Sequence, residues 1–246
     1  MLDVHESSHR VLVAIPAYNE AATVAGVIGQ VRAAVPRFDV LVVDDGSTDG
    51  TAEAAACTGA RVATHFCNLG YGRALQTALR YADRVGYTAV ITFDADGQHR
   101  ASDLEPLYQA FARGGYDLLI GSRFVKGRKY GSAAGTRRLG MWLFSTVIRL
   151  VTGRRVYDTS SGLKVIGRRV FGVLSARPVV DFHAEAIVYL IRSGYAVGEF
   201  PIAVDARRHG ESMYDVMSAL AYPLKVLFLT VLSVLDARRA RHTSHD

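Results

Sequence analysis

The sequence predicts an α/β protein in which a mainly parallel sheet is flanked by helices. Short apolar runs alternate with helix-like segments at intervals of roughly 25–30 residues, which is typical of right-handed β-α-β units. The chain has 246 residues, of which 50% are hydrophobic, so it can bury a sizeable core. Because it contains no internal repeat and no Pro- or Ser-rich linker, we expect one large domain with a C-terminal extension.

The first half of the chain contains five strand-like runs, and a helical segment follows each of the first four. The first run is expected to end at Pro16, because proline cannot continue a central strand. Asp49 or Thr51 is expected to cap the second helix. The expected strands lie within residues 10–16, 38–45, 60–66, 88–97 and 116–124, and the expected helices within residues 20–35, 49–56, 68–86 and 102–115.

The pattern is looser after Phe124. A basic, glycine-rich loop is followed by a strongly apolar segment, and a further strand, helix, helix and strand are expected before the C-terminal extension. These pieces fall at residues 125–138 (loop), 139–155 (apolar segment), 158–174 (turn, strand and helix), 181–194 (helix), 195–212 (strand and basic loop) and 214–246 (apolar helix and basic tail).

Four of the strand-like runs end in polar or acidic stretches, "PAYNE", "DDGSTDG", "DADGQH" and "GSRF". Ligands bind at the carboxyl ends of the strands in parallel α/β sheets. We therefore expect these four stretches to converge on one edge of the sheet and to form the functional site there.

Asp94 and Asp96 follow the fourth strand-like run. Residues i and i+2 of a strand point to the same side, so the two carboxylates are expected to share one cleft. Clustered carboxylates repel each other unless a cation or hydrogen bonds offset the repulsion. A divalent metal that bridges substrate phosphates would do so, and Gln98 could add an amide oxygen. The alternative is an Asp-Gly turn that only closes a buried strand.

The second strand-like run ends in another acidic pair, Asp44 and Asp45. Either carboxylate can accept hydrogen bonds from a nucleotide base or ribose, as acids do after the strands of Rossmann folds. The alternative is an Asx turn that leads into a helix cap between Ser47 and Thr51.

Other motifs exclude several classes of protein. Gly70 and Gly72 match the start of a dinucleotide-binding loop, but Leu75 replaces its third glycine and the loop follows the third strand, so an NAD-type oxidoreductase is excluded. No P-loop lysine motif and no nucleophile elbow is present. Cys57 and Cys67 fit reduced thiols of a cytoplasmic protein. The first ten residues lack the apolar stretch of a signal peptide.

Charge is distributed unevenly along the chain. Residues 1–118 contain 9 Lys and Arg against 14 Asp and Glu, whereas residues 119–246 contain 20 against 9. An acidic front half suits a metal or sugar site, and a basic rear half suits an anionic partner. Of the 29 basic residues 25 are arginine, which favours bidentate phosphate contacts. Nucleic acid is not the expected partner, because aromatic stacking runs are absent among these arginines.

Six motifs occur in an order that resembles the family 2 glycosyltransferases of GT-A fold: "IPAYNE", "VVDDGSTDGT", "NLGYGRAL", "FDADGQH", "GSRF" and "DTSSGLKVIGRRVF". The likeness is closest to the branch of dolichol-phosphate mannosyltransferase and other polyprenyl-phosphate sugar transferases, and it spans about Val11 to Ser212. The resemblance implies a Rossmann-like GT-A sheet with C-terminal amphipathic helices. The implied organisation is one domain at 10–212, with a nucleotide-sugar half at 10–123 and an acceptor half at 124–212, and an amphipathic helix with a basic tail at 213–246.

The resemblance also implies roles for individual residues. The nucleotide sugar would be bound by Pro16, Tyr18, Glu20, Val43, Asp44, Asp45, Asp94, Ala95, Asp96 and Arg123. Among these, the catalytic residues would be Asp94, Asp96 and Arg123, the last near the donor phosphates. The metal, Mg²⁺ or Mn²⁺, would be bound by Asp96 and Gln98. The phosphate of the acceptor would be held by Arg137, Arg138, Arg207 and Arg208.

The implied reaction moves a hexose, with inversion, from a nucleotide-diphosphate sugar to a polyprenyl phosphate of undecaprenyl or dolichyl type. A metal and an arginine would neutralise the leaving group, and the phosphate acceptor is already anionic, so it needs no strong base. Met213 departs from the family, which often has lysine after the residue equivalent to Ser212. This departure favours the alternative of a hydroxyl acceptor on a glycan or small molecule. A hydroxyl would need a base, for which Asp94 or a residue of 181–183 is a candidate.

Two apolar segments predict contact with an anionic membrane surface. Residues 216–235 approach the length that spans a bilayer, but Pro223 and Lys225 interrupt them, and Trp142 marks a second segment between arginine pairs. Both fit interfacial helices with arginines toward the headgroups, and the alternative is core helices with solvated basic ends. The protein is therefore expected at the cytoplasmic face of the cell membrane, where a membrane protein could receive its product. A non-catalytic module that recruits a membrane partner is a further alternative.

Overall fold

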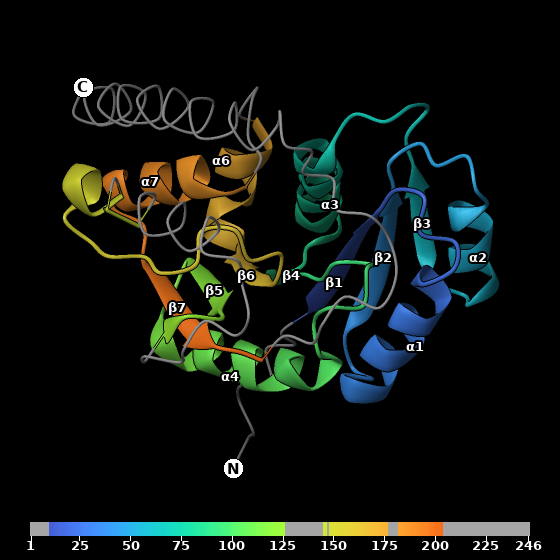
Figure 1. Cartoon of the computed structure of the whole chain (residues 1–246), viewed down its shortest axis with the longest axis horizontal. Helices are drawn as coiled ribbons and strands as arrows, with labels where there is room; N and C mark the ends of the chain where they lie inside the picture. Colours follow the sequence, from blue (N-terminus) through green and yellow to red (C-terminus); the bar gives the residue numbers. More distant parts are fainter. Residues whose placement is uncertain (1–9, 126–144, 147, 177–181, 204–246) are drawn as a thin grey trace, which may run out of the picture.

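The centre of the structure is a sheet of seven strands in the order β3-β2-β1-β4-β6-β5-β7 (Figure 1). The computed structural model describes residues 10–125, 145–146, 148–176 and 182–203. Neighbouring strands are parallel except for β6, which is antiparallel to both β4 and β5. The strands are β1 (Val11–Ala17), β2 (Asp39–Asp44), β3 (Arg61–Thr64), β4 (Ala89–Thr92), β5 (Leu118–Ser122), β6 (Lys164–Gly167) and β7 (Val197–Pro201).

Helices cover both faces of this sheet. Helices α3, α6 and α7 pack on one face, and α1, α2 and α4 pack on the other. In β1, Leu12 and Ala14 belong to the first of these two cores, whereas Val11, Val13 and Ile15 belong to the second, as the alternation of side chains along a strand requires. The helices are α1 (Val24–Ala34), α2 (Thr51–Cys57), α3 (Tyr71–Val85), α4 (Leu104–Gly114), α6 (Phe171–Ala176) and α7 (Ala184–Arg192), with short 3₁₀ turns at Ala101–Asp103 and Arg168–Val170.

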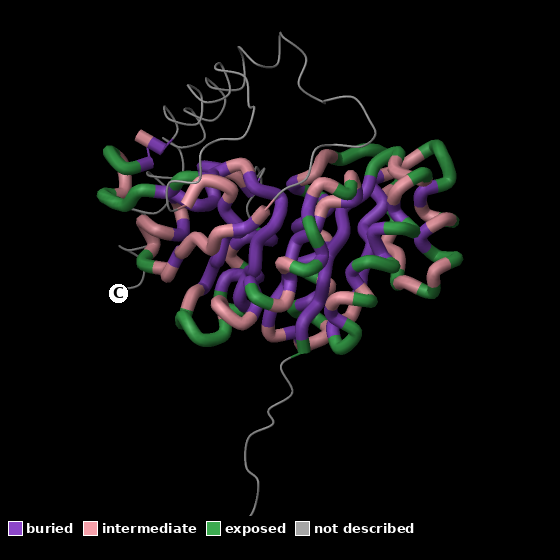
Figure 2. Tube along the Cα trace, turned by 60° about the horizontal axis from the view of Figure 1, so that its bottom comes forward, coloured by how far each residue is buried: buried purple, intermediate pink, exposed green. Residues whose placement is uncertain are grey.

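The buried part of the chain follows the strands. Figure 2 shows buried backbone running through the middle of the molecule and exposed segments gathered at the turns. All seven residues of β1 are buried, as expected for a central strand whose two faces are both covered. The predicted α/β class, the mainly parallel sheet and the flanking helices are therefore confirmed.

The prediction that the first strand ends at Pro16 is wrong by one residue, because β1 continues to Ala17. Ala14 accepts a hydrogen bond from the N–H of Phe93, so the backbone groups of Ala14 face β4. Pro16, two residues later, faces the same side, and the pairing of β1 with β4 has already ended at Ala14 and Thr92. Proline lacks a backbone N–H, but no hydrogen bond of the sheet requires one at position 16.

The predicted cap of the second helix is wrong in position. Helix α2 begins at Thr51, and the residue at the cap position is Gly50, which has a φ of 88°. A glycine tolerates this left-handed conformation without steric cost. Asp49 nevertheless accepts a hydrogen bond from the N–H of Thr51 at 3.0 Å, so its carboxylate satisfies the first free donor of the helix.

Several predictions fall outside the described residues. They include the glycine-rich loop, the first part of the apolar segment at 139–155, and the C-terminal helix and tail. The domain boundaries proposed at 123/124 and 212/213 stay predictions. Every helix within the described residues is too short or too polar to cross a lipid bilayer.

Candidate active site

The loops that follow β1 and β2 hold each other in place at the carboxyl edge of the sheet. The N–H of Asn19 donates to Ser47 Oγ at 2.9 Å, and the N–H of Glu20 donates to Thr51 Oγ1 at 2.8 Å. Asp49 also accepts a hydrogen bond from the backbone of the first loop, from Ala21 at 3.0 Å. The polar sequence "GSTD" therefore shapes the neighbouring loop, on which Tyr18 is 41% exposed.

The acidic pair at the end of β2 is buried and organises turns. Asp44 accepts the N–H of Ser47, three residues on, at 3.2 Å. The Asx turn expected as an alternative is formed by Asp49, which accepts the N–H of Thr51 two residues on. Asp45 accepts hydrogen bonds from the N–H groups of Leu69 and Gly70 at 3.0 and 2.7 Å, and contacts His65 Nδ1 at 2.7 Å. Contacts of this pair with a base or ribose stay predictions.

Asp94 and Asp96 lie together, although not for the reason the sequence suggested. Strand β4 ends at Thr92, so the two acids lie in the turn beyond it and not on one side of a strand. Tyr71, the first residue of α3, lies near both, and its pKa is raised well above its ordinary value by burial and by the charges of the two acids. The expected Asp-Gly turn is present, since Gly97 has a φ of 70°.

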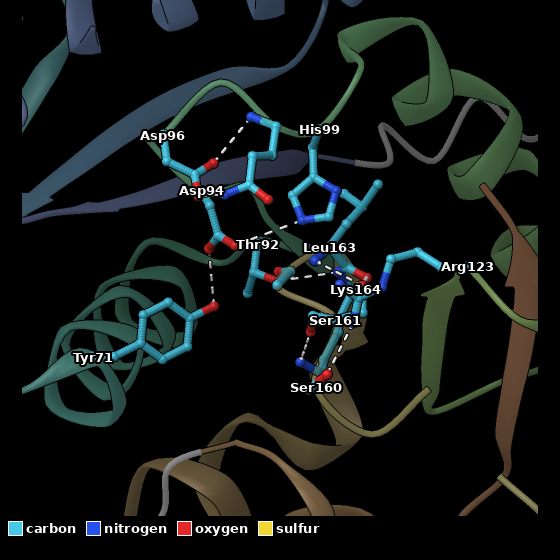
Figure 3. A network of polar contacts seen from close by, with 12 residues as sticks. Tyr71, Thr92, Asp94, Asp96, His99, Arg123, Ser160, Ser161, Leu163 and Lys164 are labelled. Carbon is cyan, nitrogen blue, oxygen red and sulfur yellow. Dashed lines mark hydrogen bonds and ion pairs between the residues drawn. The ribbon is translucent and has the colours of Figure 1, made fainter. Parts of the chain in front are cut away.

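Asp94 is held from two sides (Figure 3). Tyr71 donates its hydroxyl to Asp94 Oδ1 at 3.2 Å, and His99 Nε2 lies 3.6 Å from Asp94 Oδ2. Burial alone would raise the pKa of Asp94, but the contact with His99, the charge of Lys164 and the hydrogen bond from Tyr71 hold that pKa below its ordinary value. Asp94 is therefore an anion at neutral pH and a weak base.

Asp96 and Gln98, the predicted metal ligands, are in direct contact. Asp96 accepts the backbone N–H of Gln98 at 3.0 Å and its side-chain N–H at 2.7 Å. Within the described residues, no three His, Cys, Asp or Glu side chains converge as a complete metal site. Asp96 and Gln98 together offer a carboxylate and an amide, and Mg²⁺ binds through one or two protein carboxylates when substrate phosphates complete the coordination. Gln98 would contribute its oxygen only with the amide turned over.

Arg123, at the end of β5, is fixed by an acid that the sequence analysis did not select. Asp158 Oδ2 accepts the Arg123 Nε–H at 2.7 Å and Oδ1 accepts the Nη2–H at 2.8 Å, so the pair is bidentate. Ser160 Oγ accepts a further hydrogen bond from Nη2 at 2.9 Å. Asp158 is fully buried, and its own backbone N–H donates to Glu199 on β7. Burial would raise the pKa of Asp158, but Arg123 holds it below its ordinary value.

The loop at residues 158–162 also contacts Asp94. Gly162 lies so close that a Cβ atom on it would be 1.7 Å from Asp94 Oδ2. Thr92 donates its hydroxyl to the carbonyl of Gly162 and accepts the N–H of Lys164. The loop therefore joins the ends of β4 and β5, and it brings Asp94 and Arg123 to the same site (Figure 3).

Other predicted residues are placed less centrally or are not described. Pro16, Val43 and Ala95 are buried beside the site. Glu20 accepts the hydroxyl of Thr23 at 2.7 Å. The four predicted acceptor arginines and Met213 lie outside the described residues. The residues that the sequence analysis missed share one signal, a polar stretch directly before a strand, and they are Asp158, Ser160, Gly162 and Lys164.

Comparisons with known proteins identify the family of the chain. Residues 12–174 match the family model described as glycosyl transferase family 2. An undecaprenyl-phosphate mannosyltransferase from Micrococcus luteus is 32% identical over 82% of this chain and 86% of its own length. A polyprenol monophosphomannose synthase from Mycolicibacterium smegmatis is 32% identical over 94% of this chain and 91% of its own length.

A solved structure shares the fold. The glucosyl-3-phosphoglycerate synthase of Mycobacterium tuberculosis, crystallised with Mn²⁺, uridine-diphosphate-glucose and phosphoglyceric acid, has a TM-score of 0.67 and 21% sequence identity. The alignment covers 93% of this chain and 81% of that protein.

The chain belongs to glycosyl transferase family 2. It is a glycosyltransferase enzyme with a Rossmann-like GT-A fold. The relatives and structural neighbours indicate chemistry with nucleotide sugars.

Gly162→Ala should push Asp94 out of place, because the new methyl group would overlap its carboxylate. We expect a loss of about 1–3 kcal/mol in the free energy of unfolding, measured with urea, and at least a tenfold loss of transferase activity. Gly172→Ala on α6 is the matched control, since no atom lies within 4 Å of its new Cβ. Unchanged stability and activity in Gly162→Ala would contradict the close contact.

Asp158→Asn should lower the free energy of unfolding at pH 7 by about 3 kcal/mol, because it leaves Arg123 without its buried partner. The folded pKa of Asp158 lies below its ordinary value of 3.8, so the advantage of the wild type should be complete above that pH. It should shrink as the pH falls through the folded pKa.

Asp83→Asn is the control for this pH series. Asp83 forms an exposed ion pair with Arg168, so its loss should change stability by less than about 1 kcal/mol. If the difference in the free energy of unfolding between wild type and Asp158→Asn stays constant from pH 7 to pH 3, the ion pair of Asp158 with Arg123 is refuted.

Proposed function

We propose that the protein is an inverting, metal-dependent glycosyltransferase that moves a hexose from a nucleotide-diphosphate sugar to a polyprenyl phosphate. The acceptor would be of undecaprenyl or dolichyl type, as the names of the Micrococcus and Mycolicibacterium relatives suggest. The observation that carries the proposal is the arrangement of Asp96 and Gln98 beside Asp94, with Arg123 fixed across the loop at 158–162.

The donor diphosphate would lie between Arg123 on one side and Asp96 with Gln98 on the other. Arg123 is held by Asp158 in one orientation, so its guanidinium can bind an oxygen of the leaving diphosphate without reorganising first. Asp96 and Gln98 would hold Mg²⁺ or Mn²⁺, which supplies positive charge to the same leaving group. Asp94 would keep its place through Tyr71 and His99.

The state of Asp94 favours a phosphate acceptor over a hydroxyl acceptor. A hydroxyl needs a general base whose pKa lies near the working pH, whereas the pKa of Asp94 is lowered. A phosphate is already an anionic nucleophile and needs only alignment, for which arginines are suited. In this proposal Arg137, Arg138, Arg207 and Arg208 provide that alignment.

A hydroxyl acceptor is the second candidate, and Met213 in place of the family's lysine favours it. His183 would be the base to consider in that case, because its ring stacks on Tyr71 with 6.2 Å between the ring centroids. A non-catalytic membrane-recruiting module is set aside, since the chain belongs to an enzyme family.

The described part of the apolar segment supports a membrane-surface location. Leu150 is 81% exposed and stands beside Arg149, and Arg154 and Arg155 are exposed a few residues further on. The guanidinium of Arg155 lies 5.1 Å from the ring centre of Tyr157. Residues 145–157 contain no acid, so this surface is suited to anionic headgroups at the inner face of the cell membrane. A membrane protein could receive the product there.

A transfer assay tests the proposed function. Purified protein, Mg²⁺ or Mn²⁺ and a panel of radiolabelled nucleotide sugars are incubated with polyprenyl phosphate or with glycan hydroxyl acceptors. We expect label in the organic phase only with lipid phosphate, and a loss of at least about 100-fold in Asp96→Ala. Glu53→Ala, an exposed acid on α2, should keep full activity. Transfer to a hydroxyl but not to lipid phosphate would establish the second candidate instead.

Vesicle binding tests the membrane surface. Reversing two charges with Arg154→Glu and Arg155→Glu should weaken binding to phosphatidylglycerol vesicles at least tenfold, since each arginine near such a surface contributes about 1 kcal/mol. The control is a second double variant, Arg84→Glu with Arg113→Glu, which reverses two exposed arginines on α3 and α4. Equal binding by both double variants would argue against this surface.

A further inference from the structure

Lys164 is a lysine in an unusual place. It is the first residue of β6, the antiparallel strand, and only 1% of its surface is exposed. Burying an ammonium group is costly unless opposite charges and hydrogen bonds surround it. An apolar side chain would fill the same space without that cost, so the charge itself needs an explanation.

Acids from three different elements surround the ammonium group. Burial lowers the pKa of Lys164 to about 8, and the charges of Asp94, Asp158 and Glu185 raise it, against a smaller opposing effect of Arg123. Asp94 follows β4, Asp158 begins the loop before β6, and Glu185 lies on α7. Arg123 is bidentate with Asp158 and His99 contacts Asp94, and Lys164 adds a further positive charge among Asp94, Asp158 and Glu185.

Lys164 also fixes the loop that reaches Asp94. Its Nζ donates to the carbonyl of Ser161, and its backbone N–H donates to Thr92 Oγ1 at 3.1 Å. Thr92 in turn donates to the carbonyl of Gly162, the residue that lies against the Asp94 carboxylate. One side chain therefore supplies both a positive charge near Asp94 and a hydrogen bond to the loop packed on it (Figure 3).

We propose that Lys164 is a positioning residue for sugar transfer, which keeps Asp94 and the loop at 158–162 in the arrangement that the reaction needs. This role rests on the proposed function. It is distinct from substrate binding, because Lys164 lies beneath the site and acts through Asp94 and Gly162. A purely structural lysine would affect stability alone, whereas a positioning lysine affects the rate of transfer more than donor binding.

Lys164→Met tests this role in the full-length protein. Methionine fills a similar volume without charge, so we expect kcat to fall at least about 30-fold while the KM for the donor changes less than about threefold. The control is Tyr87→Phe, which removes a hydrogen bond to Asp39 from a buried side chain at the opposite end of the sheet. Its kcat should stay within about twofold of the wild type even if its melting temperature falls equally.

A pH profile supplies a second readout. The wild-type kcat should fall on the alkaline side as Lys164 loses its proton, and this limb should be missing in Lys164→Met but present in Tyr87→Phe. Equal kinetic losses in the two variants, or an alkaline limb that survives in Lys164→Met, would overturn the positioning role.

Hydrogen exchange separates this proposal from the proposed function. If the wild-type protein transfers no sugar from any donor, the proposed function fails, but exchange at residues 160–163 still reports on the loop. Faster exchange there in Lys164→Met, and not in Tyr87→Phe, supports the placement of the loop by Lys164. Unchanged exchange refutes it.

Discussion

The bidentate pair between Arg123 and fully buried Asp158 is the interaction on which the rest of the site depends. It attaches the loop at residues 158–162 to the end of β5, while the hydrogen bond between Thr92 and Gly162 attaches the same loop to the end of β4. This is possible because β6 runs antiparallel between those two strands, so the chain enters β6 at the edge where β4 and β5 end. A purely parallel sheet would have placed this loop at the opposite edge.

The charges of the site follow from this arrangement. Arg123 and Lys164 stand among Asp94, Asp158 and Glu185, and Asp96 lies at the rim beyond them. Acids outnumber bases here, which suits a divalent cation that arrives with an anionic diphosphate. The protein itself holds one guanidinium and several carboxylates in fixed positions. The charges of the metal ion and the diphosphate would be added when the substrate binds.

Much of the fold could be predicted from sequence, because the spacing of apolar residues that distinguishes strands from helices is visible within a short stretch of chain. The alternation of apolar runs with helical segments predicted the sheet, and the polar strand ends predicted its functional edge. The antiparallel direction of β6 could not be predicted, since nothing within "GLKVIGR" distinguishes the two directions. The partnership of Asp158 with Arg123 joins residues 35 positions apart and depends on that direction. The contact between Asp96 and Gln98, the proposed metal ligands, could be predicted because the two residues are only two positions apart in a turn.

We propose that the donor diphosphate and its metal bind between Asp96 and Gln98 on one side and Arg123 on the other. Anomalous diffraction from crystals grown with Mn²⁺ and a nucleoside diphosphate tests this most directly. We expect one manganese peak at roughly 2.0–2.3 Å from an Asp96 oxygen, with the diphosphate within hydrogen-bond distance of Arg123. A manganese peak away from Asp96, or a diphosphate that does not contact Arg123, would contradict it.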